Sequence, residues 1–400
     1  MLVAVVGGKL QGIEAAYLAR KAGWHVRVVD KTPRVPASGL GDEFVQVDVT
    51  VADRPGGILD DVDLIIPALE DDRALVSLTH WSRKTGVPLA FDPQAYAVSS
   101  SKPRSTELFR KIGLPVPLAW PHCSYPVLAK PGRGSGSKGV QVFHDSDALE
   151  KKFSPQFPPP DWVLEEYVDG SQHSLEVIGR PGSYRALQVT DLYVDRQLDC
   201  KRVIAPSMLS RNLTAEFERL SLSIAEALAL KGVMDVEVIF SRGEFKVLEI
   251  DARLPSQTPT AVYWSTDQNM VELLGCLYIK AQNGGHAAGE VLRAAVYEHV
   301  HASRDVLQIS GERAMAAGGP LSLQQDFFGA DEAITDFGSG RKQWVATLIY
   351  SGPDRRRAME NRKRGIAEMV RQLGIRTVVD PQLHVTSENI GSSEQEYIVD

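Results

Sequence analysis

The sequence Glu249-Ile250-Asp251-Ala252-Arg253 closes an apolar run that begins at Phe245. A second apolar run, residues 234–240, opens with Asp235-Val236-Glu237. If the two runs form neighbouring strands, four carboxylates and one guanidinium come together at one place. Crowded carboxylates repel one another unless a divalent cation lies between them, and oxygen ligands suit Mg²⁺, which commonly holds substrate phosphates. The pattern therefore predicts nucleotide chemistry, and the alternative is a solvated acidic rim on a sheet.

Length and composition indicate an ordinary soluble chain of more than one domain. The 400 residues exceed what one hydrophobic core usually serves, so two or three domains are expected. The net charge of −7 argues against a nucleic-acid partner. Cys123, Cys200 and Cys276 lie far apart without a CxxC pair, which fits a reducing compartment. Because no leader-like amino terminus and no apolar stretch of about 18 residues occurs, we expect a cytoplasmic protein without a membrane partner. The oligomeric state, a homodimer included, stays open.

Residues 1–97 are predicted to form a Rossmann-like parallel sheet. The first turn reads Gly7-Gly8-Lys9-Leu10-Gln11-Gly12, so Lys9 stands where a GxGxxG motif has its second glycine, and an NAD site is disfavoured. Asp30 ends the second apolar run, where it can bind a ribose or an amine or cap a helix. The runs alternate with helical stretches in the rhythm of βαβ units; they are residues 2–6, 25–29, 44–47, 64–67 and 88–91.

Residues 98–190 are predicted to form a small α+β lid. A short helix carries Lys102, and a strand then ends at Lys130. The glycine- and serine-rich turn 131–139 follows, and it leaves backbone N–H groups free to wrap phosphate oxygens. It is not a Walker loop because a strand follows it, and the alternative is a merely flexible hairpin. The segment Glu165-Glu166-Tyr167-Val168 then ends a further apolar strand.

Residues 191–385 are predicted to form a carboxyl-terminal α+β domain that contains the acidic strand pair. Helices are expected near 215–230, 270–281 and 356–373. Residues 386–400 contain few apolar side chains and are predicted to be a flexible tail.

In chain order, the two lysines, the glycine loop, the Glu-Glu-Tyr-Val segment and the Glu-x-Asp-x-Arg strand resemble the ATP-grasp superfamily. The resemblance implies an α/β ATP-grasp architecture with ATP and Mg²⁺ as cofactors. Asp251 stands where most members of the superfamily have asparagine. The implied roles are phosphate neutralisation by Lys102 and Lys130, phosphate cover by Ser135, Gly136, Ser137 and Gly139, adenine contact by Glu165, Glu166, Tyr167 and Val168, and Mg²⁺ binding by Glu237, Glu249 and Asp251.

Three longer strings resemble the ligases of pyrrolysine biosynthesis. They are residues 7–17, residues 231–237 and the stretch EIDARLPSQTPTAVY at 249–263. The resemblance implies an ATP-dependent, ADP-forming ligase that joins the carboxylate of 3-methyl-D-ornithine to the ε-amine of L-lysine through an acyl phosphate. Unmethylated D-ornithine is an alternative substrate.

The same resemblance implies where the two amino acids bind. An amine nucleophile must lose a proton, which for an unperturbed lysine costs roughly 4 to 5 kcal/mol at pH 7, so a nearby carboxylate base is expected. Asp235 and Glu70 are the candidates for the base, and Arg253 faces the transferred group. Lysine is expected near Lys9, Leu10, Gln11, Asp30 and Glu70, and the ornithine-type substrate near Ser174, Glu176, Asp235, Arg253, Ser256 and Thr258.

Three alternatives remain open. One is a different ATP-grasp ligase, of the D-alanine–D-alanine type or a dipeptide ligase. A second is a protein that binds ATP without turning it over. A biotin-dependent carboxylase subunit is the third, and it would leave the amine-binding amino-terminal pocket without a role.

Overall fold

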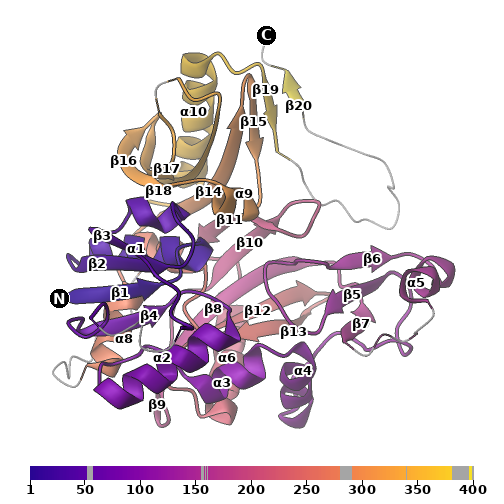
Figure 1. Ribbon diagram of the computed structural model, residues 1–400. Helices are drawn as coiled ribbons and strands as arrows, with labels where there is room; N and C mark the ends of the chain where they lie inside the picture. Colours follow the sequence, from indigo (N-terminus) through magenta and orange to yellow (C-terminus); the bar gives the residue numbers. More distant parts are fainter. Residues whose placement is uncertain are drawn as a thin grey trace.

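The computed structural model in Figure 1 describes residues 1–51, 57–154, 157, 159, 161–279, 291–338 and 340–380 and the backbone of 396–398. Within that part the strands form three sheets, of four, three and thirteen strands. No helix in the same part combines the length and the apolar character needed to cross a bilayer.

The first sheet is parallel, as predicted for a Rossmann-like unit, with the order β3-β2-β1-β4. Its side chains alternate between two apolar layers: Val3 and Val5 face α1, whereas Ala4 and Val6 face α2. Because the order reverses beside β1, a crevice forms at the carboxyl ends of β1 and β4. The elements are β1 (Leu2–Val6), α1 (Leu10–Lys21), β2 (His25–Asp30), the 3₁₀ helix η1 (Pro36–Gly39), β3 (Glu43–Gln46), β4 (Leu64–Pro67), α2 (Asp72–Thr85) and α3 (Pro93–Ser99).

The second sheet is a small antiparallel lid with the order β6-β5-β7. Its own core is small and contains Val127, Phe143, Leu149 and Leu164. Figure 1 shows it extending away from the rest of the molecule, with β6 and α5 at its outer end. The elements are α4 (Lys102–Lys111), β5 (Val127–Pro131), β6 (Gln141–Phe143), α5 (Ser146–Phe153) and β7 (Trp162–Glu166).

The third sheet carries the acidic strands and follows the order β13-β12-β8-β10-β11-β14-β15-β19-β20, with four strands off this path. Its strands are β8 (Ser171–Arg180), β9 (Ser183–Ala186), β10 (Thr190–Val194), β11 (Cys200–Ala205), β12 (Gly232–Ser241), β13 (Glu244–Asp251), β14 (Ala294–Ser303), β15 (Val306–Ile309), β16 (Ser322–Phe327), β17 (Ala330–Thr335), β18 (Gln343–Gly352), β19 (Thr377–Val379) and β20 (Glu396–Ile398). Its helices are α6 (Arg211–Leu228), α7 (Thr258–Thr266), α8 (Met270–Tyr278), α9 (Arg313–Ala317) and α10 (Arg355–Leu373).

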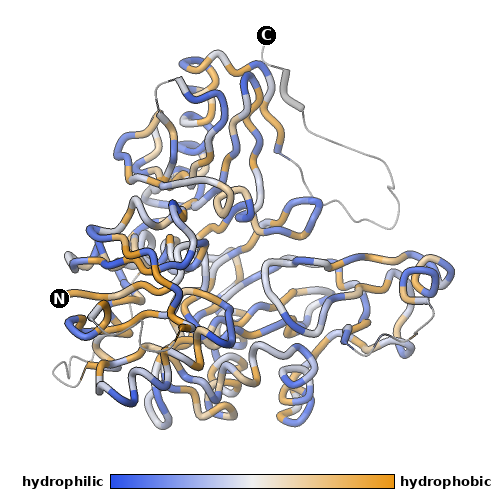
Figure 2. Tube along the Cα trace, viewed as in Figure 1, coloured by the Kyte–Doolittle hydropathy of each residue, from blue (hydrophilic) through white to orange (hydrophobic). Residues whose placement is uncertain are grey.

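The long helices begin and end where the sequence provides caps. The Ser210 side chain accepts from Leu213 at the start of α6, Asp354 accepts from Arg357 at the start of α10, and Gly374 ends α10 in the left-handed region. One apolar cluster contains Ile13 of α1, Val262 of α7 and Ile349 of β18. The amino-terminal unit therefore packs directly against the third sheet. Figure 2 shows the strand next to the amino terminus as a hydrophobic stretch.

Strand pairing bears on the segment limits predicted from the sequence. β8 and β9 lie within residues 98–190, yet they pair in the third sheet, so the change from the lid to the third sheet falls between Glu166 and Ser171. The boundary at 190 stays a prediction. Of the predicted tail 386–400, residues 396–398 pair antiparallel with β19, and the rest lies outside the described residues.

Candidate functional site

A cavity of about 700 Å³ lies where the three sheets meet. Its walls come from the ends of β1 and β4, the turn after β5, the segment after β7, and the facing strands β12 and β13. It is lined by these residues predicted from the sequence: Lys9, Leu10, Gln11, Asp30, Glu70, Lys102, Lys130, Ser135, Gly136, Ser137, Glu165, Glu166, Tyr167, Val168, Asp235, Glu237, Glu249, Asp251, Arg253, Ser256 and Thr258. Gly139 lines a smaller cavity of about 400 Å³, and Ser174 and Glu176 line neither of the two.

The acidic strands pair as the sequence predicts. β12 and β13 are antiparallel, with Asp235 opposite Asp251 and Glu237 opposite Glu249, so the four carboxylates share one face. Burial raises the pKa of Asp235 to about 7 and that of Asp251 to about 6. Burial and the nearby Glu249 raise the pKa of Glu237 well above its ordinary value. Burial and mutual repulsion therefore make these three acids harder to ionise than free carboxylates.

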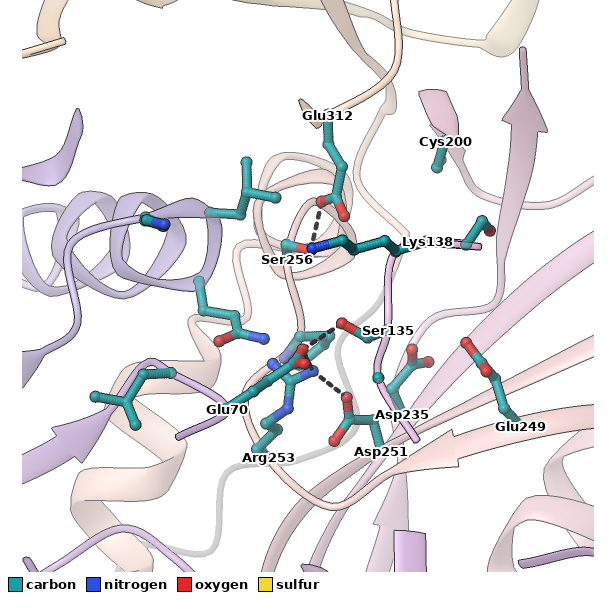
Figure 3. Close-up of a pocket in the computed structure, with 18 of the residues that line it drawn as sticks. Glu70, Ser135, Lys138, Cys200, Asp235, Glu249, Asp251, Arg253, Ser256 and Glu312 are labelled. Atoms are coloured by element: carbon teal, nitrogen blue, oxygen red, sulfur yellow. Dashed lines mark hydrogen bonds and ion pairs between the residues drawn. The ribbon is translucent and has the colours of Figure 1, made fainter. Parts of the chain in front are cut away.

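Basic side chains offset part of this negative charge. The Lys102 Nζ lies 3.0 Å from Glu249, and the Lys130 Nζ lies 2.6 Å from Glu165. Burial opposes ionisation of Glu249, but Lys102 and Lys130 outweigh it and lower its pKa. In Figure 3, Arg253 makes ion pairs with Asp251 and Glu70. Each of these lysines is therefore neutralised by an acid of the cavity wall.

The acids of this face include one directly opposed pair. Among the described residues, no group of three or more His, Cys, Asp or Glu side chains is close enough together to hold a metal. Glu237 and Glu249 nevertheless stand directly opposite each other, and burial, followed by the charge of Glu249, raises the pKa of Glu237. Two such oxygens suit Mg²⁺, which usually takes one or two carboxylates together with substrate phosphates.

The glycine-rich turn is held from both sides of the cavity. The Ser135 hydroxyl donates to Glu70 of the amino-terminal unit, and Arg133 pairs with Asp72. From the third sheet, Arg313 Nη2 donates to the Gly136 carbonyl at 2.8 Å. Gly134 has φ +95°, which glycine adopts without strain, and its carbonyl accepts a hydrogen bond from Lys102 Nζ at 2.7 Å. The turn therefore covers the cavity and contacts both neighbouring units.

The first turn of the chain is built by close packing. A Cβ at Gly7 would lie 2.3 Å from the Ala68 carbonyl, and the φ of Gly7 is +109°. Asp30 accepts hydrogen bonds from the Gly8 amide at 2.8 Å and from the Thr32 amide at 2.7 Å. Asp30 therefore fixes the turn that carries Lys9 at the edge of the cavity.

Several buried polar atoms in or behind the cavity wall have no hydrogen-bond partner in the described part of the chain. They include both carboxylate oxygens of Glu176, the Thr258 hydroxyl, and Nε and Nη1 of Arg253. Glu176 is fully buried, and burial together with Asp235 raises its pKa to about 8. Ser174 donates to Asp235 from the next strand. Buried donors and acceptors of this kind are uncommon, since most such groups in folded proteins are paired with protein or water.

Residues that the sequence did not suggest also line the cavity, among them Asp199, Cys200, Gln257 and Glu312. Glu312 accepts hydrogen bonds from the Ser256 hydroxyl at 2.7 Å and from the Gln257 amide at 2.8 Å. Burial and the Glu312 charge raise the pKa of Asp199 to about 7. Figure 3 shows Lys138 pointing toward Ser256 and Glu312. No local motif surrounds these acids, so only the strand order β11-β14-β15 could have placed them here.

Comparison with known proteins gives three findings. Residues 99–257 match the model of the ATP-grasp domain. The chain is 36% identical over 377 residues to the 3-methyl-D-ornithine–L-lysine ligase of Methanosarcina mazei, and this alignment covers 93% of this chain and 96% of that protein. It is 34% identical to the ligase of the same name from Methanosarcina barkeri, with 93% of this chain and 98% of that protein covered. The fold is similar to that of a biotin carboxylase from Campylobacter jejuni, with a TM-score of 0.72, 14% identity, and 92% and 91% of the two chains covered.

Proposed function

We propose that this chain, a member of the family of 3-methyl-D-ornithine–L-lysine ligases, joins the carboxylate of 3-methyl-D-ornithine to the ε-amine of L-lysine with ATP. It would thereby act in pyrrolysine biosynthesis. The observation that carries this proposal is the identity of more than a third over nearly the whole of both chains. The cavity supports it, because all but three of the residues expected for ATP and for the two amino acids line one continuous space; the exceptions are Gly139, Ser174 and Glu176.

ATP would bind between the lid and the third sheet. Lys102 and Lys130 stand on the acidic side of the cavity, and the turn 133–138 lies over it. The Glu166 and Tyr167 amides donate to Leu118 and Pro126, so we assign the adenine edge to the Val168 amide. A triphosphate placed in this way reaches from the lid to the strand pair β12 and β13.

Glu237 and Glu249, with Asp251 beside them, are the residues that would hold Mg²⁺. The ion would supply positive charge against the phosphate oxygens. When phosphates are bound, Lys102 would leave its ion pair with Glu249 and bind the phosphate oxygens instead. The Glu249 carboxylate would then be free for the metal.

The ornithine-type carboxylate would attack the γ-phosphate to form an acyl phosphate, and Arg253 would hold the reacting oxygens through Nε and Nη1, which have no partner in the described chain. The unpartnered Glu176 and Thr258 and the neighbouring Asp235 would hold an ammonium group of that substrate. Acids without cations buried beside a cavity favour a cationic ligand.

Lysine would enter from the amino-terminal side, along Lys9, Leu10, Gln11 and Glu70. Its ε-ammonium must lose a proton before it attacks, which costs roughly 4 to 5 kcal/mol at pH 7. Asp235, with a pKa of about 7, is matched to accept that proton, whereas Glu70 stays the alternative because it contacts both Arg253 and Ser135. Displacement of phosphate by the free amine would give the amide.

The test is mass spectrometry of the product formed from ATP, Mg²⁺, L-lysine and 3-methyl-D-ornithine or D-ornithine. We expect ADP, phosphate and an amide at Nε of lysine. A product linked only through Nα would indicate a dipeptide ligase, and ATP binding without phosphate release with any amine would indicate a binding protein. Either result contradicts the proposal.

A further inference from the structure

The turn Ser256-Gln257-Thr258, which joins Arg253 to α7, has a strained backbone. Gln257 has φ +76° and ψ −57°, and the Thr258 amide donates to the Ser256 carbonyl at 2.9 Å. These values define the uncommon γ-turn with positive φ, which side-chain-bearing residues rarely adopt. Such a conformation persists only where its surroundings hold it, and it places Ser256 and Thr258 in the wall of the cavity.

Gln257 anchors the turn on one side. Its amide nitrogen donates to Glu312 at 2.8 Å and to the Cys200 carbonyl at 3.3 Å. Both partners belong to the cavity wall formed by the third sheet. This anchor is local, since it comes from the same sheet that carries the cavity.

The second anchor comes from the amino-terminal unit. Glu14 of α1 accepts hydrogen bonds through Oε2 from the Thr260 amide at 3.1 Å and from the Thr260 hydroxyl at 2.6 Å. Its other oxygen accepts from the Tyr297 hydroxyl at 2.7 Å. The residue before α7 supplies no side-chain cap, so Glu14 satisfies the open amide of the first helical turn from another element.

The burial of Glu14 argues against a purely stabilising role. Its side chain is 1% exposed and its hydrogen-bond partners are neutral hydroxyl and amide groups. Burial raises the pKa of Glu14 to about 7, which means that its ionised form disfavours folding. A neutral acceptor would satisfy the same donors at lower cost, so what Glu14 contributes at the turn is its accepting oxygen and not its charge.

We propose that Glu14 is a positioning residue, which fixes the strained turn through Thr260 so that Ser256 and Thr258 face the ornithine-type substrate. The proposal rests on the ligase function above, and it adds a residue that does not line the cavity. It also means that α1, which opens beside the predicted lysine pocket, helps to shape the pocket of the other amino acid.

The test compares Glu14→Ala with Glu14→Gln. We expect Glu14→Ala to lower kcat/KM for D-ornithine by about ten- to a hundredfold and to leave KM for ATP unchanged, because small displacements of orienting groups have effects of that size. Glu14→Gln keeps an oxygen that accepts from Thr260, so it should restore kcat/KM to within about threefold of wild type.

Glu332→Ala is the matched control. Glu332 is a buried carboxylate that accepts from the Tyr17 hydroxyl at 2.7 Å and pairs with Lys21, so it ties α1 to β17 without touching the turn. We expect this variant to lower the thermal midpoint and to leave both KM values unchanged. If Glu14→Ala behaved in the same way, with kcat/KM for D-ornithine intact below its midpoint, the residue would be structural only and the proposal would be wrong.

Thr260→Val keeps the amide and removes only the hydroxyl donor, and it decides the question if Glu14→Ala does not fold. It should weaken D-ornithine binding, measured by calorimetry without ATP, by about threefold, in line with the loss of one hydrogen bond. Thr260→Ser should bind as wild type. Equal binding by all three proteins would overturn the proposal. A wild-type protein that binds D-ornithine but forms no amide would overturn the ligase function and leave this comparison valid.

Discussion

The ammonium of Lys102 lies 3.0 Å from the carboxylate of Glu249, across the junction between the lid and the third sheet. Lys102 belongs to the first turn of α4, and Glu249 belongs to β13, opposite Glu237. The lysine lowers the charge of the acidic face in the absence of phosphates. In the proposed function, a bound triphosphate would pair with Lys102 and free the Glu249 carboxylate for the metal, so this ion pair would link nucleotide binding to metal binding.

Glu249→Gln should therefore weaken metal-dependent turnover. The amide cannot supply the negative charge that a divalent ion requires, and we expect kcat/KM for ATP to fall by about a hundredfold, with a partial recovery at raised Mg²⁺. Titration of the rate against Mg²⁺ measures the effect. Glu244→Gln, an exposed change on the same strand, is the control and should titrate as wild type. An unchanged Mg²⁺ titration in Glu249→Gln would remove Glu249 from the metal site.

Arg313 should hold the glycine-rich turn over the nucleotide. Its guanidinium donates to the Gly136 carbonyl through Nε at 3.2 Å and Nη2 at 2.8 Å. Arg313→Ala removes both hydrogen bonds, so we expect KM for ATP to rise by about three- to tenfold with the thermal midpoint nearly unchanged, because the side chain is half exposed. Arg341→Ala, which removes another exposed arginine, should leave KM for ATP as it is. Equal KM values in the two variants would contradict the role of the turn contact.

The rate of amide formation should depend on the ionisation of Asp235. Burial raises its pKa to about 7, so the carboxylate form that accepts a proton becomes scarce below that pH. We expect kcat to fall tenfold per pH unit below about pH 6 and this limb to disappear in Asp235→Asn, which should also be slower by at least about a hundredfold.

Glu70→Gln distinguishes the two candidate bases. If Asp235 is the base, Glu70→Gln keeps the acid limb of the pH profile and changes mainly KM for lysine. A profile that loses the limb in Glu70→Gln and keeps it in Asp235→Asn would assign the proton transfer to Glu70.

Much of the fold follows from local sequence signals. The alternation of Val3 and Val5 with Ala4 and Val6 encodes a sheet covered on both faces, and the sheet around β1 is parallel, as predicted. The acid spacing on β12 and β13 was also readable, because Asp235 and Glu237 must share one face of a strand, as must Glu249 and Asp251. The roles of the two lysines and of the glycine-rich turn were predicted only through the resemblance to the superfamily.

Local sequence patterns could not predict the contacts between segments that lie far apart in the sequence. Glu312 lies 55 residues from Gln257 in sequence, and no local pattern states that its carboxylate receives the Gln257 amide. Glu14 looks like one polar position of a helix, although 246 residues separate it from Thr260. The positive φ of Gln257 was equally unreadable, because the sequence there contains neither glycine nor asparagine.

Glu14 should make the stability of the protein depend on pH in a way that Glu14→Gln removes. Its pKa rises from 4.5 to about 7 on folding because the side chain is buried. Between these values the folded state keeps the proton that the unfolded state has lost, so this contribution to stability is complete below pH 4.5, declines as the pH rises, and is lost above about pH 7. The total is about 3 kcal/mol.

Glutamine stays neutral, so Glu14→Gln should gain stability relative to wild type between pH 5 and pH 8. Chemical denaturation at the two pH values measures the gap, and Glu216→Gln, on the exposed side of α6, should show none. A gap between wild type and Glu14→Gln that is the same at both pH values would mean that Glu14 is ionised across the whole range.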